Sequence, residues 1–102
     1  MLTKTKVKEI QRTITEEDGR LPMVFSALSD PGRFRIFGLL TKQKDICVTD
    51  VASIFGISVP AASQQLRVLE MCGLVRKERM GQMICYEIKR DDPLVKSLMK
   101  FF

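Results

Sequence analysis

The sequence predicts a mainly α-helical fold that carries one small β-hairpin. Residues 48–71 have the pattern of two short amphipathic helices joined by a tight turn. Residues 74–89 follow at once, as two short runs separated by the turn Met80-Gly81-Gln82. Apolar and polar side chains roughly alternate in the second run, which is typical of a half-buried hairpin. This order predicts a winged helix-turn-helix with about five helices and a two-stranded wing, and the whole chain, residues 1–102, is expected to form one domain.

The first helix is expected over residues 4–14, because Val7, Ile10 and Ile14 fall on one face. Basic side chains occupy much of the remaining surface, so this helix is predicted to be both basic and amphipathic. Two roles are open to it: an arm that holds a second subunit, or a contact to the DNA backbone. A second helix is predicted over Leu21–Leu28.

The third helix is predicted to begin after Asp30, whose carboxylate suits the first free amides of a helix. Its apolar residues predict a core position. At the other end of the chain, Pro93 begins a short helix that carries more apolar surface than a chain end should expose. Burial against a second subunit explains this surface most simply, and packing onto the chain's own first helices is the alternative. Segments 4–28 and 93–102 are therefore the expected dimerisation helices.

The helix-turn-helix itself is predicted from local signals. The first of its helices is expected over Val48–Phe55, and Gly56 suits the left-handed backbone at a helix end. Ser58 is the expected N-cap of the second helix, which is predicted over Val59–Met71. Pro60 fits the first turn, where amides have no intrahelical partner.

The second helix has a buried face and a face suited to the major groove of DNA. Ala62, Leu66 and Leu69 share one inward stripe, which leaves small and polar residues on the outside. Slim side chains let a helix approach base edges, and glutamine or serine can both donate to and accept from them. The expected DNA contacts are Ser58, Ala61, Ser63, Gln64, Gln65 and Arg67 around this helix and Arg76, Lys77, Arg79 and Gln82 on the wing.

Composition supports an anionic partner and argues against several classes of protein. The net charge is +5 and the pI is near 9.4. No apolar stretch approaches the roughly 18 to 20 residues of a membrane span, and no signal peptide opens the chain, so a cytoplasmic protein is expected. Histidine and glycine-rich phosphate loops are absent, so an enzyme is not expected. The alternative function is a winged-helix protein-interaction module that does not bind DNA.

The three cysteines are expected to be reduced thiols, because their number is odd and no secretory signal is present. Cys72 and Cys85 lie at positions that commonly pack as small hydrophobic groups. Cys47 lies near a helix N-terminus, where the helix dipole lowers the pKa of a thiol and favours its oxidation. The neighbouring Asp50 opposes that shift. Cys47 is therefore the candidate sensing thiol, with core packing as the alternative.

Three segments together resemble the ArsR/SmtB family of repressors: ALSDPGRFRIFGLL at 27–40, DICVTDVASIFGISVPAASQQLRVLEMCGLV at 45–75 and GQMICYEI at 81–88. The resemblance implies a homodimer that pairs through its first and last helices, binds double-stranded DNA at inverted-repeat operators and releases it when an inducer binds. It also implies that residues 58–67 form the reading helix and that residues 76–86 form the wing.

The resemblance does not extend to the metal sites of the family. Its arsenic and cadmium sensors carry two cysteines where this chain has Cys47 and Thr49. A second cysteine site is also incomplete, since Val68 stands one turn before Cys72. The zinc sensors use histidine, which this chain lacks. A single thiolate does not make a soft-metal site, so no metal and no cofactor are expected, and the inducer is not identified by the sequence.

Overall fold

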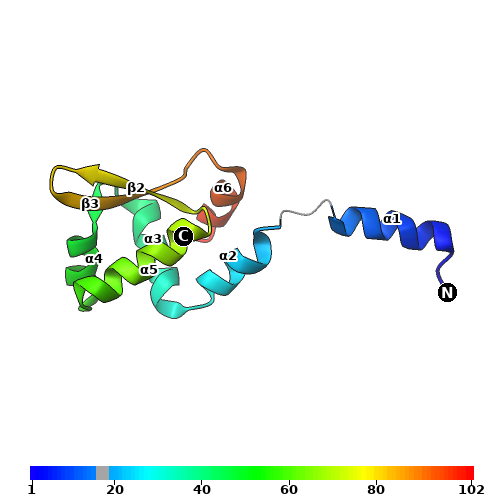
Figure 1. Cartoon of the computed structure of the whole chain (residues 1–102), viewed down its shortest axis with the longest axis horizontal. Helices are drawn as coiled ribbons and strands as arrows, with labels where there is room; N and C mark the ends of the chain where they lie inside the picture. The colour runs from blue at the N-terminus through cyan, green and yellow to red at the C-terminus, as the bar shows by residue number, and fades with distance from the viewer. Residues whose placement is uncertain (16–18) are drawn as a thin grey trace.

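The computed structural model describes residues 1–15 and 19–102, and Glu16, Glu17 and Asp18, inside the expected segment 4–28, lie outside this description. Six helices and three strands are found in the described residues, in place of about five helices and two strands (Figure 1). In chain order they are α1 (Lys4–Thr15), α2 (Leu21–Leu28), α3 (Pro31–Lys42), β1 (Ile46–Cys47), α4 (Val48–Phe55), α5 (Val59–Met71), β2 (Val75–Met80), β3 (Met83–Ile88) and α6 (Pro93–Met99).

Three of the helices begin with the same local device, an oxygen-bearing side chain that accepts a hydrogen bond from a free backbone amide. A proline follows within two positions, where its missing N–H costs nothing and its fixed φ favours the first turn. The caps are Asp30 of α3 to the amide of Arg33 (2.9 Å), Ser58 of α5 to the amide of Ala61 (3.2 Å) and Asp92 of α6 to the amide of Leu94 (2.9 Å).

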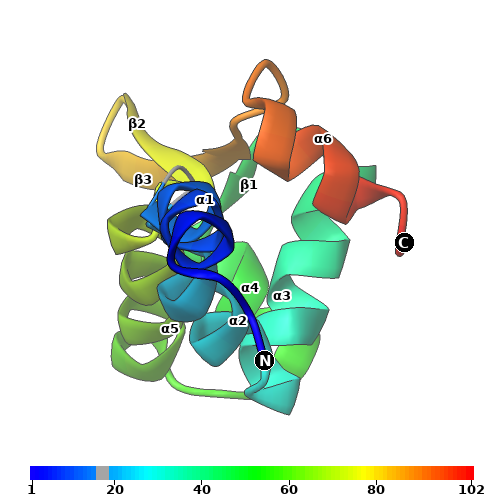
Figure 2. The ribbon, with the colours of Figure 1, turned by 90° about the vertical axis from the view of Figure 1, so that its right-hand side faces the viewer.

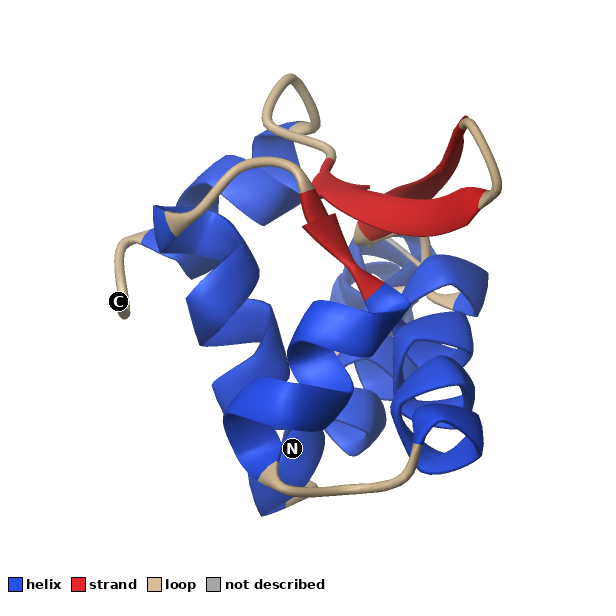
Figure 3. Cartoon of the chain, turned by 90° about the vertical axis from the view of Figure 1, so that its left-hand side faces the viewer, coloured by secondary structure: helices blue, strands red, loops and turns tan. Residues whose placement is uncertain are grey.

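The sheet has three antiparallel strands in the order β1-β3-β2, so the wing hairpin gains a strand from the segment before α4 (Figure 3). Cys47 on β1 stands opposite Cys85 on β3, which in turn stands opposite Glu78 on β2. β1 is not predicted by the sequence, because a strand of two residues is too short to show an alternation of apolar and polar side chains. Its pairing is a tertiary contact between segments about forty residues apart in the chain.

The core lies between the helices and one face of the sheet. Its largest fully buried side chains come from α2, α3, α4, α5, the start of the wing and α6, namely Val24, Ile36, Phe37, Leu40, Val51, Leu66, Leu69, Leu74, Val75 and Val95. The inward stripe predicted for α5 is confirmed, since Ala62, Leu66 and Leu69 are all fully buried. This burial fixes which face of α5 is left for solvent.

The C-terminal segment packs partly onto the chain's own α3, beside which α6 lies in Figure 2. The ring of Phe102 lies 4.8 Å from that of Phe34 and 5.5 Å from that of Phe37, measured between centroids. Gly38 makes room for it, because a Cβ there would come within 2.8 Å of the Phe102 ring. Phe101 instead remains 77% exposed. The segment therefore buries some of its apolar side chains internally and leaves one large aromatic free.

Asp92 fastens the start of α6 to the segment before α2. Its carboxylate accepts two hydrogen bonds from the Arg20 guanidinium, at 2.9 and 3.2 Å, in addition to the bond from the amide of Leu94. The hydrogen bonds from Arg20 lower the pKa of Asp92; burial opposes this shift and the backbone amides reinforce it. A carboxyl whose pKa is lowered by folding contributes its full stabilisation at any pH above its ordinary pKa. This contribution is lost as the pH falls through the pKa of the group in the folded state.

Replacing Asp92 with alanine is expected to lower the free energy of unfolding by about 1 to 3 kcal/mol near pH 7, through loss of the cap and of the bonds to Arg20. Urea unfolding of Asp92→Ala and the parent chain measures this difference. The difference in free energy of unfolding between the two proteins should become smaller as the pH falls below 3.8, the ordinary pKa of an aspartate carboxyl. Asp91→Ala removes a neighbouring, exposed carboxylate and serves as the matched control. A gap that persists unchanged at low pH would contradict the charge-based explanation.

Candidate nucleic-acid interface

The helix-turn-helix forms at the predicted residues. Gly56 adopts the left-handed conformation, with φ of 65°, and closes α4 by donating its amide to the carbonyl of Ala52. The amide of Ile57 donates to the same carbonyl at 3.0 Å. Ser58 then caps α5. The turn is thus held by backbone hydrogen bonds and a left-handed glycine, a conformation that other residues adopt only at a cost.

Nine of the ten predicted contact residues are exposed, and Gln65 is the half-buried exception. The exposed set is Ser58, Ala61, Ser63, Gln64 and Arg67 on and before α5 and Arg76, Lys77, Arg79 and Gln82 on the wing. The structure thus brings two separate segments of the predicted set to the surface, one on the reading helix and one on the hairpin.

Gln65 is turned inward, toward α3, and fastens the two helices together. Its side-chain oxygen accepts a hydrogen bond from Arg33 Nη1 at 2.9 Å, and its amide nitrogen lies 3.5 Å from the carboxylate of Asp30. Arg33 also donates from Nε to the carbonyl of Ala27 at 2.8 Å. The amide of Gln65 is therefore engaged within the protein, where sequence analysis expected it to face a base edge. Its position directly before the buried Leu66, at the border of the stripe, was the available signal.

Arg33, which was not among the predicted site residues, supports the interface from behind. Its guanidinium bridges the end of α2, through the Ala27 carbonyl, and the middle of α5, through Gln65. A planar guanidinium with several fixed donors suits such a bridge better than a lysine would. The outward angle of α5 thus depends on a side chain from α3, 32 residues earlier in the chain.

The two faces of the wing carry different basic side chains. Lys77 and Arg79 stand opposite Tyr86 and Ile84, so they extend from the face that packs on the helices. Arg76 points to the other face, where it lies 3.5 Å from the carboxylate of Asp91. The pKa of the buried Tyr86 is raised, first by burial and further by the charge of Glu70, and the charge of Arg67 opposes this shift. Lys77 and Arg79 are therefore the wing cations on the α5 side.

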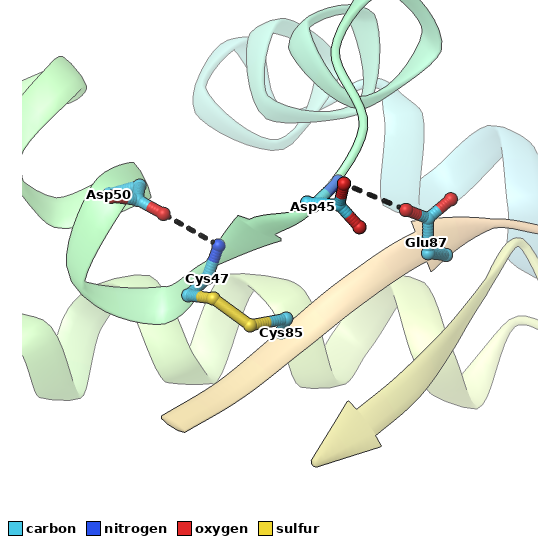
Figure 4. Close-up of a disulfide and its surroundings, with 5 residues drawn as sticks. All are labelled: Asp45, Cys47, Asp50, Cys85 and Glu87. Atoms are coloured by element: carbon cyan, nitrogen blue, oxygen red, sulfur yellow. Dashed lines mark hydrogen bonds between the residues drawn. A yellow bond between two sulfur atoms is a disulfide. The ribbon is translucent and has the colours of Figure 1, made fainter. Parts of the chain in front are cut away.

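Cys47 and Cys85 form a disulfide, which corrects the expectation of three reduced thiols (Figure 4). The physical reason is β1, which places the two residues directly opposite one another with their Cα atoms 3.7 Å apart. Cysteines whose Cα atoms are more than about 7 Å apart cannot be joined without backbone movement. The amide of Cys47 also donates to the Asp50 carboxylate at 2.9 Å. Cys47 is thus paired in this structure and is not a single free thiol.

Cys72 is a free and fully buried cysteine whose thiol lies 3.8 Å from the carbonyl of Met23. Burial raises its pKa, with a smaller opposing effect of the Arg33 charge. A raised pKa keeps the thiol protonated and unreactive. This agrees with the packing role expected for it. Within residues 1–15 and 19–102, no three histidine, cysteine or acidic side chains gather as metal ligands would. No helix in that part of the chain has the length and apolar character of a membrane span.

Residues 30–77 match the model of a family described as bacterial regulatory protein, arsR family. The chain is 35% identical, over 81% of its length, to a transcriptional repressor SmtB homolog of Synechocystis, and it spans 64% of that protein. It is 40% identical to the transcriptional repressor SdpR of Bacillus subtilis, over 64% of this chain and 71% of that repressor.

Among solved structures, the fold resembles the homodimeric winged helix-turn-helix DNA-binding domain Mb0332 of Mycobacterium bovis. The TM-score is 0.70 at 24% identity, and the alignment covers 98% of this chain and 82% of the other. At this identity the comparison shows the fold alone. The winged helix-turn-helix predicted from the sequence is thereby confirmed.

Proposed function

Because the chain belongs to the arsR family of bacterial regulatory proteins, we propose that it is a homodimeric, sequence-specific repressor that binds an inverted-repeat operator in double-stranded DNA. Family membership places it among transcriptional regulators and not among enzymes. One observation carries the proposal: α5 presents a row of small and polar side chains to solvent beside a basic wing. This combination suits a helix in the major groove with a hairpin on the adjacent backbone.

The proposed contacts divide into base reading and phosphate binding. Ser63 and Gln64 are exposed near the start of α5, where side chains of a recognition helix reach base edges. Arg67, a turn later, and the wing cations Lys77 and Arg79 suit phosphates, which position a protein without reading sequence. Gln65 is proposed as a positioning residue, because Arg33 and Asp30 already engage its amide.

Two exposed apolar surfaces support the homodimer. The first is the apolar stripe of α1, formed by Val7, Ile10 and Ile14, on a helix that stands away from the remaining elements (Figure 1). The second is a cleft of about 450 Å³ beside the C-terminus, lined by Phe25, Leu28, Ser29, Phe34, Leu98, Phe101 and Phe102. Contiguous apolar surface of this kind marks an interaction site. The stripe and most of the cleft lining belong to the segments expected to pair, 4–28 and 93–102, while Ser29 and Phe34 lie between them in the chain.

The input to this repressor is proposed to act through thiols and not through a metal. Neither cysteine set of the family's metal sensors is complete, and the described residues hold no alternative cluster of ligands. The sensing group is Cys47, acting together with Cys85, to which it is bonded. Since a repressor acts where the genome lies, the proposal also places the chain in the cytoplasm.

Selection of bound duplexes from a random pool tests the function directly. A homodimeric repressor should enrich a palindrome whose half-sites lie about one helical turn apart. Binding to the selected duplex should weaken steeply between about 50 and 200 mM salt, because each neutralised phosphate releases counterions. Absence of retardation even at low salt would instead favour the alternative, a winged-helix module that docks a protein through α5 or the C-terminal surface.

The register of the wing makes a sharper test possible. Lys77→Ala and Arg79→Ala are each expected to weaken binding to all duplexes by the same factor. Each should also reduce the slope of log affinity against log salt concentration by about 1. Arg76→Ala removes the same charge from the same strand, but from the opposite face and beside Asp91, so its effect should be clearly smaller. Fluorescence anisotropy across a salt series measures all three. Equal losses for the three variants would contradict the proposed orientation of the wing.

A further inference from the structure

The Cys47–Cys85 disulfide joins the two halves of the proposed DNA interface. Cys47 is the residue directly before α4, the first helix of the helix-turn-helix. Cys85 lies in β3, the central strand of the sheet and one arm of the wing. Figure 4 shows the bond crossing from the start of α4 to β3. The bond therefore fixes the wing relative to the helix-turn-helix, at a place where β1 contributes only two residues of backbone pairing.

One side of this bond borders a cleft. A cleft of about 280 Å³ lies between α4, α5 and the tip of the wing, and its lining includes Cys47 but not Cys85. Val59 and Ser63 of α5 and Gln82 and Met83 of the wing form its other walls. Cys47 is 7% exposed and Cys85 is 1% exposed. Of the two bonded cysteines, Cys47 is therefore the one that borders a cleft of small-molecule size.

The compartment in which the protein is proposed to act favours a disulfide that forms and breaks reversibly. This step rests on the proposed function, because a repressor shares its compartment with DNA. Thiol-reducing systems keep most cysteines reduced there, and the disulfides that do form are usually transient, catalytic or redox-sensing. Cys72 provides a contrast within the same chain, since it is buried in the core as a free thiol and forms no disulfide.

We propose that Cys47 and Cys85 are a thiol–disulfide exchange site for small-molecule thiols and disulfides. The disulfide-bonded (closed) form holds the wing in the orientation that binds DNA more tightly than the reduced (open) form does. In the opening reaction, the thiolate of a small thiol attacks Sγ of Cys47, and Cys85 leaves as a thiolate that takes up a proton. A second small thiol attacks the mixed disulfide and releases Cys47. Two small thiols are oxidised to one disulfide while the protein pair is reduced to two thiols.

The direction of the effect follows from pre-organisation. With the bond closed, α4, α5 and the wing approach DNA as one body, and little freedom is lost on binding. With the bond open, the segment before α4 keeps the two-residue β1–β3 pairing and the hydrogen bond from the Asp45 amide to the Glu87 carboxylate, but no covalent bond limits the movement of the wing. Ordering it on DNA then costs binding free energy. The closed form should bind its selected duplex at least about fivefold more tightly, the lower end of typical coupling between two sites.

The test uses the full chain equilibrated with 2-mercaptoethanol or with 2-hydroxyethyl disulfide. Alkylation under denaturing conditions followed by mass spectrometry should label all three cysteines in the first case and Cys72 alone in the second. Anisotropy on the selected duplex should give the tighter binding for the second. Cys72→Ser is the matched control and should switch like the parent chain. Cys47→Ser, which removes the sulfur that exchanges and leaves Cys85 buried, should bind with one affinity in both buffers.

The outcomes separate this inference from the proposed function. Equal affinity of the open and closed forms would overturn the inference and leave the repressor assignment intact. Labelling of three cysteines in the presence of excess 2-hydroxyethyl disulfide would overturn it as well. If neither form retards any duplex, the proposed function fails and the coupling to DNA fails with it, while the labelling pattern still reports whether the pair exchanges.

Discussion

Replacing Val7, Ile10 and Ile14 with serine is expected to convert the proposed dimer into a monomer and to weaken binding to a palindromic operator by about 10² to 10⁴-fold. These side chains form the apolar stripe of α1 and are 40%, 39% and 59% exposed. Every residue from 4 to 14 is exposed in the single chain. Isolated helices shorter than about 12 to 15 residues are marginal in water, so the 12 residues of α1 need a partner surface to remain helical.

The magnitude comes from loss of the second half-site. Two linked recognition helices bind a palindrome with the second event at high effective concentration, and a monomer forfeits that gain without losing any contact of its own. Light scattering should report the monomer mass, and anisotropy should report the weaker binding. Affinity for a single half-site should be unchanged in the same variant, since α5 and the wing are untouched.

A matched control lies on the opposite face of α1. Replacing Thr5, Lys8 and Glu9 with serine introduces the same number of serines and leaves the net charge unchanged, since one base and one acid are removed together. This variant should remain dimeric. A stripe variant that keeps its dimer mass but binds DNA more weakly would contradict the arm role and would favour the other role expected from the sequence, a contact of α1 with the DNA backbone.

The parts of the fold that the sequence predicts well are those encoded by neighbouring residues. The bounds of α2, α4 and α5 agree with the predicted ones, because a cap, a proline in the first turn and a glycine at the end are all local signals. The buried stripe of α5 follows from helical periodicity in the same way. The hairpin is likewise predicted from a local signal, the glycine of its turn, and Gly81 does adopt a left-handed conformation there, with φ of 65°.

The features that the sequence does not predict depend on residues far apart in the chain. β1 exists because β3 is there to pair with it, and the disulfide follows from that pairing across 38 residues. The inward turn of Gln65 depends on Arg33, a side chain of α3. Counting cysteines and the absence of a secretory signal favoured free thiols, and neither observation carries information on which strands lie side by side.

The second large effect is expected at Leu66, which separates the structural face of α5 from its reading face. Leu66 is fully buried in the core. Leu66→Ala should lower the free energy of unfolding by about 2 to 5 kcal/mol, through lost transfer free energy and the cavity left behind. Against a total of about 5 to 15 kcal/mol for a typical domain, this is a large share. Urea unfolding at fixed protein concentration measures it, since stability of a dimer depends on concentration.

Gln64→Ala, two residues earlier on the exposed face, should weaken operator binding and leave stability almost unchanged. Its stability should lie within about 0.5 kcal/mol of the parent chain, as for most surface substitutions. Its binding to the selected operator should weaken by about 1 to 3 kcal/mol, the value of one good bidentate base contact, while binding to unrelated duplexes stays the same. If Gln64→Ala weakens all duplexes equally, Gln64 contacts the backbone and reads no base. If Leu66→Ala spares stability but removes DNA binding, the assignment of the two faces is reversed. A loss of stability in Leu66→Ala, together with a loss of operator binding at normal stability in Gln64→Ala, is expected only if α5 buries Leu66 and presents Gln64 to the major groove.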